Sequence, residues 1–93
     1  MFKYCKIQIT GRVQGVAFRY YSKLNADRLD LVGTTENQPD GSVETFVCGQ
    51  DECVDQFIQW CHEGSPASRV EEVKVTELSG GSSQLYKEFI ILR

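Results

Sequence analysis

The chain has 93 residues, of which 41% are hydrophobic and 25% are charged, and its formal net charge is −3 at pH 7. This length and composition predict one globular domain over residues 1–93 and exclude a disordered chain, and the negative charge argues against a nucleic-acid binder, which gains affinity by neutralising phosphates. There is no basic-then-apolar leader and no apolar run near the roughly 20 residues of a membrane span, so we expect a cytoplasmic protein that does not bind membranes. Nothing in the sequence demands more than a monomer, and no nucleic-acid partner is expected.

The first two predicted elements are a strand and a helix. Residues 3–10 alternate in polarity, which is typical of a half-buried strand whose inner face carries Cys5, Ile7 and Ile9. Residues 18–29 predict a helix with one narrow stripe of apolar or small side chains, namely Phe18, Ser22, Ala26 and Leu29. This helix should end near Asp30, a residue that tolerates the left-handed conformation less readily than glycine does.

A hairpin is predicted next. Residues 31–37 form the second strand, which is weak at its centre, and residues 42–48 form the third, whose shared face carries Val43, Thr45 and Val47. Between them, Gln38-Pro39-Asp40-Gly41 is a strong turn signal, because proline presets its backbone angle and glycine accepts a positive one.

The rest of the chain predicts one more helix and two extended segments. Residues 51–62 carry an apolar stripe at helical spacing, formed by Val54, Phe57, Ile58 and Cys61. Gly64-Ser65-Pro66 ends this helix. The segment from Val70 to Val75 is expected to be extended, Ser79 to Ser83 to form a flexible loop, and Phe89 to Leu92 to form a last strand.

The order of these elements predicts an α+β fold, a ferredoxin-like βαββαβ sandwich. Short hairpins and right-handed crossovers favour a four-stranded antiparallel sheet of order 4-1-3-2, with both helices on one face. The first and second strands then run parallel, so the loop after the first and Asn37 at the end of the second meet at one edge of the sheet. Thr34, Thr35 and Glu36 make the second strand look unsuited to pairing along its free edge.

The clearest functional signal is the segment Gly11-Arg12-Val13-Gln14-Gly15-Val16-Ala17-Phe18-Arg19. A glycine-bearing loop between a strand and a helix start directs several backbone N–H groups at one point, next to the positive end of the helix dipole. Arg19 can close on the same anion, bidentately if that anion is a phosphate.

Asn37 is the second candidate catalytic residue. The first and second strands are two strand spacings apart, roughly 10 Å, which leaves room for a phosphoryl group and one water between Arg19 and Asn37. These residues include no nucleophile or general base, so the site suits attack by water on a phosphoryl group with a good leaving group. Taken singly, each residue also has a plain structural reading, since an arginine can form a surface salt bridge and an asparagine often enters a turn.

The same residues resemble the signatures of the acylphosphatase family. Gly11 to Arg19 resembles G-x-V-Q-G-V-x-F-R, and Gly33 to Glu44 resembles G-W-V-x-N-x-x-D-G-x-V-E. Gly64 to Val70 and Phe89-Ile90 are similar to the later segments G-P-x-x-A-x-V and F-x-I. The resemblance covers nearly the whole chain and implies a metal-independent hydrolase without cofactors, which splits small acyl phosphates into a carboxylate and inorganic phosphate. It also implies that Asn37 holds the attacking water and that the phosphate is bound by Gln14, Gly15, Val16, Ala17, Phe18 and Arg19.

The chain departs from these signatures at four positions. Thr34 and Thr35 stand where Trp and Val are usual, so the second strand should bury less apolar area. Glu36 stands where a basic residue is common, and although strand alternation directs it away from the face of Asn37, its charge should weaken substrate binding. Ala17 replaces a frequent glycine, and its small side chain is expected to be tolerated.

Three other functions stay open at this point. A non-catalytic ferredoxin-like module could bind a phosphorylated metabolite or a protein without turnover, and Glu36 and the weak second strand favour it. An RNA-binding domain would need exposed aromatics, for which Tyr4 and Phe46 are candidates, on a basic sheet face that this acidic chain lacks. The chain could also be a fragment of a larger carbamoyl-transfer protein that bears an acylphosphatase-like domain.

The four cysteines predict reduced thiols and no metal site. They form no C-x-x-C pair and have no histidine cluster beside them. Cys5 and Cys48 fall on opposite faces of the predicted sheet, so they cannot bridge without a bulge or a register shift. Cys53 and Cys61 lie eight helical residues apart, about 12 Å, which is beyond the reach of a disulfide.

Overall fold

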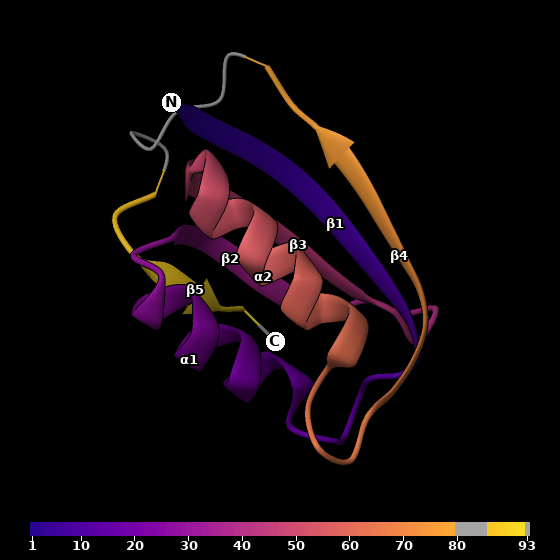
Figure 1. Ribbon diagram of the computed structural model, residues 1–93. Coiled ribbons are helices and arrows are strands. Elements are labelled where there is room, and N and C mark those ends of the chain that lie inside the picture. The colour runs from indigo at the N-terminus through magenta and orange to yellow at the C-terminus, as the bar shows by residue number, and fades with distance from the viewer. Residues whose placement is uncertain (80–85, 93) are drawn as a thin grey trace.

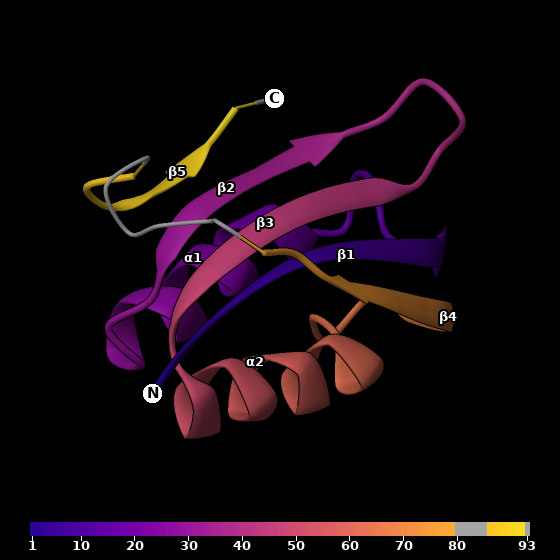
Figure 2. The ribbon, with the colours of Figure 1, turned by 90° about the horizontal axis from the view of Figure 1, so that it is seen from above.

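The computed structural model describes residues 1–79 and 86–92 as one sheet with two helices on one of its faces (Figures 1 and 2). The elements in chain order are β1 (Phe2–Arg12), α1 (Phe18–Arg28), β2 (Val32–Asn37), β3 (Val43–Gln50), α2 (Asp51–Glu63), β4 (Arg69–Glu77) and β5 (Phe89–Ile91). The strand order is β4-β1-β3-β2-β5. The predicted ferredoxin-like α+β fold is confirmed, with one strand more than expected. Neither helix in the described ranges is long and apolar enough to cross a membrane.

The predicted order placed the last strand, residues 89–92, beside β1, and this is wrong. The segment from Arg69 to Glu77, which was expected only to be extended, takes that place. It pairs with β1 in antiparallel register, but the register shifts between Thr10 and Gly11. Thr10 pairs with Glu72 and Gly11 with Val70, so Glu71 is the extra residue of a bulge. This bulge explains why the valines of β4 do not follow a simple two-residue period in the sequence.

The last strand, β5, lies at the opposite edge of the sheet and runs parallel to β2 (Figure 2). The sheet is therefore mixed, and the predictions of a fully antiparallel sheet and of a free polar edge on β2 are wrong. The N–H of Gly33 donates to the carbonyl of Glu88 at 3.1 Å, and the N–H of Leu92 donates to that of Thr35 at 2.9 Å. The fully buried ring of Phe89 anchors β5 in the core. The flexible loop predicted for Ser79 to Ser83 lies outside the described residues, apart from Ser79.

The core lies between the helices and the inner face of the sheet, and the predicted stripes supply it. The buried residues that the sequence placed inward are Cys5, Ile7, Ile9, Phe18, Ser22, Ala26, Leu29, Val43, Thr45, Val47, Val54, Phe57 and Cys61. Ile58 is only partly buried at the margin of this cluster. The aromatic rings of Phe57 and Phe89 pack with their centroids 5.9 Å apart, which ties α2 to the last strand.

Two buried threonines meet at the centre of the sheet. Thr35 of β2 and Thr45 of β3 are directly opposite and fully buried, and their hydroxyl oxygens lie 2.9 Å apart. Since each hydroxyl has the other as its hydrogen-bond partner, most of the cost of burying them is avoided. This pair supports the strand that looked weak in the sequence, and the strand carries Asn37 at its end.

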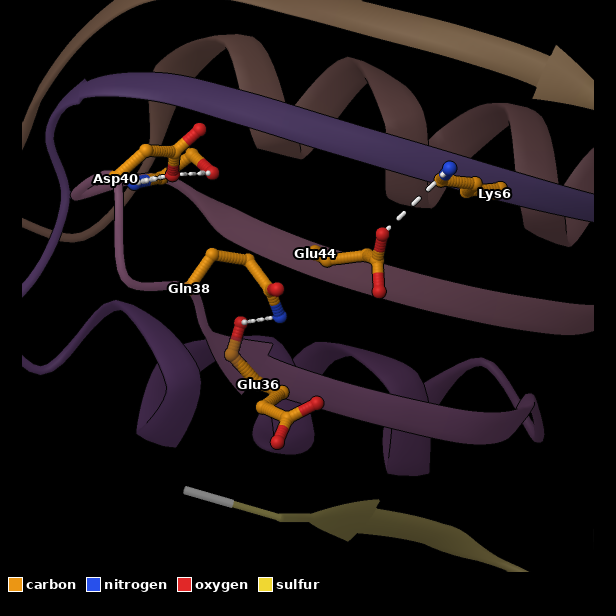
Figure 3. Close-up of polar contacts among 6 residues, drawn as sticks. Lys6, Glu36, Gln38, Asp40 and Glu44 are labelled. Carbon is orange, nitrogen blue, oxygen red and sulfur yellow. Dashed lines mark hydrogen bonds and ion pairs between the residues drawn. The ribbon is translucent and has the colours of Figure 1, made fainter.

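The predicted hairpin between β2 and β3 is confirmed. The N–H of Gly41 donates to the carbonyl of Gln38 at 3.0 Å, and the N–H of Gln38 donates to that of Ser42 at 2.8 Å. The hydroxyl and the N–H of Ser42 donate to the Asp40 carboxylate at 2.6 and 2.9 Å (Figure 3), and these bonds hold the pKa of Asp40 below its usual range. The turn thereby fixes the place where β2 ends.

All four cysteines are free thiols. Cys5 lies opposite Val47, and Cys48 lies opposite Tyr4, so Cys5 and Cys48 are on opposite faces of the sheet, as predicted. Burial raises the pKa of the Cys61 thiol far above its usual value. This buried thiol acts as a small apolar side chain of the core.

Candidate active site

Residues 13–17 and the end of β2 lie at the same end of the sheet, where β1 and β2 both finish (Figure 1). This follows from the topology, because β1 and β2 both run antiparallel to the β3 strand between them. Ile9 of β1 and Asn37 of β2 both pair with Val43, from its two sides. Asn37 is therefore two strand spacings, about 10 Å, from β1. The loop and the end of β2 therefore lie at the same end of the sheet, as the topology predicts.

The loop holds two residues in the left-handed conformation. Gly15 has a φ of 73° and Ala17 a φ of 63°. Left-handed residues in a turn bring successive N–H groups to one side, an arrangement that binds anions. Ala17 is also the N-cap of α1, where no side chain caps the first N–H groups and no acidic residue occupies the first turn. The loop thus presents backbone donors and the positive end of the helix dipole together.

A shallow hollow of about 190 Å³ lies against this loop. Its lining residues are Val13, Gly15, Ala17, Phe18, Arg19, Tyr20 and Ile91. Arg19 and three of the predicted loop residues therefore border one space. The side chain of Tyr20, next to Arg19, is 57% exposed. Ile91 reaches the hollow from β5, and no sequence pattern predicts this, because the place of Ile91 depends on the unpredicted pairing of β5 with β2.

Two side chains tether the loop to the rest of the fold. The side-chain amide of Gln14 donates to the backbone carbonyls of Gln38 and Ser42, at 2.8 and 2.9 Å. Gln14 was predicted to bind phosphate through its backbone N–H, and its side chain joins the loop to the hairpin turn. On the other side, the Ser65 hydroxyl donates to the carbonyl of Val16 at 2.7 Å. No sequence signal pointed to Ser65.

Asn37 carries an unpartnered oxygen. Its side-chain Oδ1 is buried and accepts no hydrogen bond. Within residues 1–79 and 86–92, no other buried side-chain N or O atom lacks a hydrogen-bond partner. An orphaned buried acceptor is costly, so native structures usually give it a donor. Asn37 shares the inner face of β2 with Thr35, as strand alternation requires. A water molecule is one such donor.

Glu36 lies on the opposite, outer face of the sheet, as predicted from alternation. It pairs directly with Glu44, and Lys6 lies 3.6 Å from the Glu44 carboxylate on the other side (Figure 3). Two like charges directly opposite each other are unfavourable, and Lys6 offsets only one of them. The Glu36 carboxylate therefore adds negative charge near the end of β2, but on the face of the sheet opposite to that of Asn37.

The described ranges contain no group of three or more His, Cys, Asp or Glu side chains arranged to hold a metal ion. The predicted site residues supply backbone N–H donors, the Arg19 guanidinium and the Asn37 amide. Such groups bind and orient an oxyanion and a water molecule.

Replacing Ala17 by glycine is expected to raise the free energy of unfolding by about 1 kcal/mol. Ala17 has a φ of 63°, a conformation that costs an L-residue free energy and costs glycine almost none. The alanine is tolerated, as expected, but at this cost. Urea denaturation of the two proteins measures the difference. The matched control is Ala26→Gly inside α1, which should lower the free energy of unfolding; a loss of stability in both variants would contradict the assignment of strain to Ala17.

Comparison with known proteins gives consistent matches. The sequence model of the acylphosphatase family matches residues 5–91. The chain is 43% identical over 83 residues to an acylphosphatase of Nocardioides sp., covering 89% of this chain and 81% of that protein. It is also 43% identical over 88 residues to an acylphosphatase of Acaryochloris marina, covering 95% and 91% of the two chains. The crystal structure of acylphosphatase from Bacillus subtilis has a TM-score of 0.91 and 35% identity, with both chains covered in full.

Proposed function

The chain belongs to the acylphosphatase family, enzymes that hydrolyse acyl phosphates, and we propose which of its residues perform that reaction. Arg19 and the backbone N–H groups of residues 14–19 bind the phosphate of a small acyl phosphate. Asn37 binds the water that attacks it. Hydrolysis releases a carboxylate and inorganic phosphate.

The observation that carries this assignment is the orphaned Oδ1 of Asn37. A water molecule that donates one proton to this oxygen has a lone pair free to face the phosphorus. The bond from the water oxygen to phosphorus forms as the bond from phosphorus to the carboxylate oxygen breaks. The electron pair leaves with the carboxylate, and the proton of the water passes to the phosphate. The substrate is thus its own proton acceptor, which explains why the site needs no general base.

The loop and Arg19 supply the electrostatic part of catalysis. Negative charge on the three equatorial oxygens of the phosphoryl group is held by donors that are already oriented before the reaction. The leaving carboxylate is stable, so positioning and charge stabilisation suffice for a fast reaction. Because the net charge of the chain is −3, attraction of the anionic substrate is local to this edge of the sheet.

We further infer that residues 1–93 form one acylphosphatase domain that acts as a cytoplasmic monomer and needs no nucleic-acid partner. The single sheet with one shared core supports the single domain. The charged residues of β4 and the shortness of β5 support the monomer, since both features discourage pairing of sheet edges between copies.

Replacing Asn37 by alanine is expected to lower kcat by about 100-fold, because the water loses the acceptor that orients it. The assay follows hydrolysis of an aromatic acyl phosphate in the presence of a chelator, with folding checked by circular dichroism. The matched control is Asn25→Ala on α1, whose amide donates to the carbonyl of Tyr21 and whose loss should leave kcat unchanged. Full turnover by Asn37→Ala would contradict the role of Asn37. A well-folded wild type without turnover would indicate a phosphate-binding module.

A further inference from the structure

The Ser65 hydroxyl fixes the direction of one peptide group in the phosphate loop. Ser65 follows α2, and only 3% of its surface is exposed. Its Oγ donates to the carbonyl of Val16 at 2.7 Å, across 49 positions of the sequence. Val16 stands between the two left-handed residues Gly15 and Ala17, at the centre of the loop. The hydrogen bond therefore acts on the part of the loop that has the most unusual conformation.

A trans peptide points its C=O and its N–H in opposite directions. The described peptide bonds include no cis bond, so holding the Val16 carbonyl toward Ser65 turns the N–H of Ala17 away from Ser65. Ser65 borders another hollow together with Tyr21 and Trp60, whereas Ala17 and Arg19 line the hollow beside the loop. Turning the N–H of Ala17 away from Ser65 therefore leaves it free for a ligand in the hollow that Ala17 and Arg19 line.

We propose that Ser65 is a positioning residue of the phosphate site, which aims the N–H of Ala17 at the bound phosphate. The inference rests on the proposed function, because it takes the hollow by Arg19 as the phosphate site. Ser65 does not touch the substrate and acts through the Val16 carbonyl. The glycine at position 15 permits rotation of the neighbouring peptide group, so the loop needs a tether to keep one orientation.

Ser65 is itself held in place. The hydroxyl and the N–H of Ser68 both donate to the carbonyl of Ser65, at 2.7 and 3.0 Å. Gln14 holds the loop from the opposite side through the carbonyls of the hairpin turn. The peptide between Val16 and Ala17 therefore lies between two fixed supports, and Ser65 is the one that acts on it directly.

The test compares two serine variants in the same short segment. Ser65→Ala is expected to weaken the binding of inorganic phosphate about 5-fold and to raise KM for an acyl phosphate to a similar extent, because one neutral hydrogen bond is lost. In the wild type, the amide resonance of Ala17 shifts on titration with phosphate; in Ser65→Ala this shift should be much reduced. Ser68→Ala loses the hydroxyl donor to the Ser65 carbonyl but keeps the N–H donor at 3.0 Å, so Ser65 should stay in place. This variant should therefore lower the melting temperature without changing phosphate affinity.

A second variant guards against a loss of folding. Ser65→Cys keeps the shape of the side chain but donates a weaker hydrogen bond, so its phosphate affinity should fall between those of the wild type and Ser65→Ala. Unchanged phosphate affinity in the folded Ser65 variants, or an equal loss in Ser68→Ala, would overturn the proposal. Arg19→Ala distinguishes a failure of the proposed phosphate site from a failure of the positioning role of Ser65. If it binds phosphate as the wild type does, the site itself is misplaced; if only the Ser65 variants behave as the wild type, the positioning role alone fails.

Discussion

Arg19→Ala lowers kcat/KM for acyl phosphate hydrolysis by about 1,000-fold, the loss expected when a guanidinium that stabilises a phosphoryl transition state is removed. Arg19 borders the hollow at the start of α1, and none of its neighbours in the first turn of that helix is acidic. The variant removes both the positive charge and the two parallel donors of the guanidinium fork. Initial-rate kinetics with a simple aromatic acyl phosphate measure the effect.

Two further variants sharpen this prediction. Arg19→Lys keeps the charge but not the fork, so its activity should lie between those of the wild type and Arg19→Ala. Arg28→Ala, at the other end of α1, removes a donor to the Asn25 side chain 3.1 Å away and should leave kcat/KM unchanged. If Arg19→Ala kept activity within tenfold of the wild type, Arg19 would not be the main phosphate ligand.

Gly33→Ala is expected to lower the free energy of unfolding by about 3 kcal/mol or more. Gly33 has a φ of 148°, and a Cβ added there would collide with the backbone carbonyl of Phe46 on β3. This carbonyl belongs to a paired strand, so it cannot move aside without breaking the ladder. Since β2 also pairs with β5 at Gly33, the substitution weakens both sides of the strand that carries Asn37.

The matched control for this prediction is Gly15→Ala. Gly15 also has a positive φ, of 73°, but a Cβ added there meets no atom within 4 Å. It therefore carries only the conformational cost of the left-handed region, about 1 kcal/mol. Chemical denaturation of the two variants separates collision from backbone strain. Equal losses of stability would show that the carbonyl of Phe46 yields to the new methyl group.

The parts of the fold that the sequence predicted are those with local signals. The alternation of residues 3–10, the helical stripes and the Pro-Asp-Gly turn each depend on neighbours in the chain, and each is present in the structure. The edge strands were harder to predict. The bulge at Glu71 interrupts the two-residue polarity period of β4. β5 is only three residues long, and its position depends on the burial of Phe89. The positions of β4 and β5 are set by pairing with strands that are distant in the sequence.

In the candidate site, too, some parts could be predicted from the sequence and others could not. The loop and Asn37 could be brought together from topology alone, because parallel strands end at the same edge of the sheet. The tether from Ser65 and the wall from Ile91 could not, since both come from segments whose positions depend on β4 and β5. The Thr35–Thr45 pair is a third example. Each threonine alone reads as a weak strand residue, and only the register shows that their hydroxyls satisfy each other.

The central claim is that phosphate binds at the loop with Arg19, while Asn37 acts on the water. Titration of ¹⁵N-labelled protein with inorganic phosphate, followed by two-dimensional NMR, tests it most directly. In the wild type, the amide resonances of residues 15–19 should shift. The shifts should vanish in Arg19→Ala and persist in the inactive Asn37→Ala. Unmoved loop amides in the wild type, or loss of phosphate binding in Asn37→Ala with its retention in Arg19→Ala, would contradict the account.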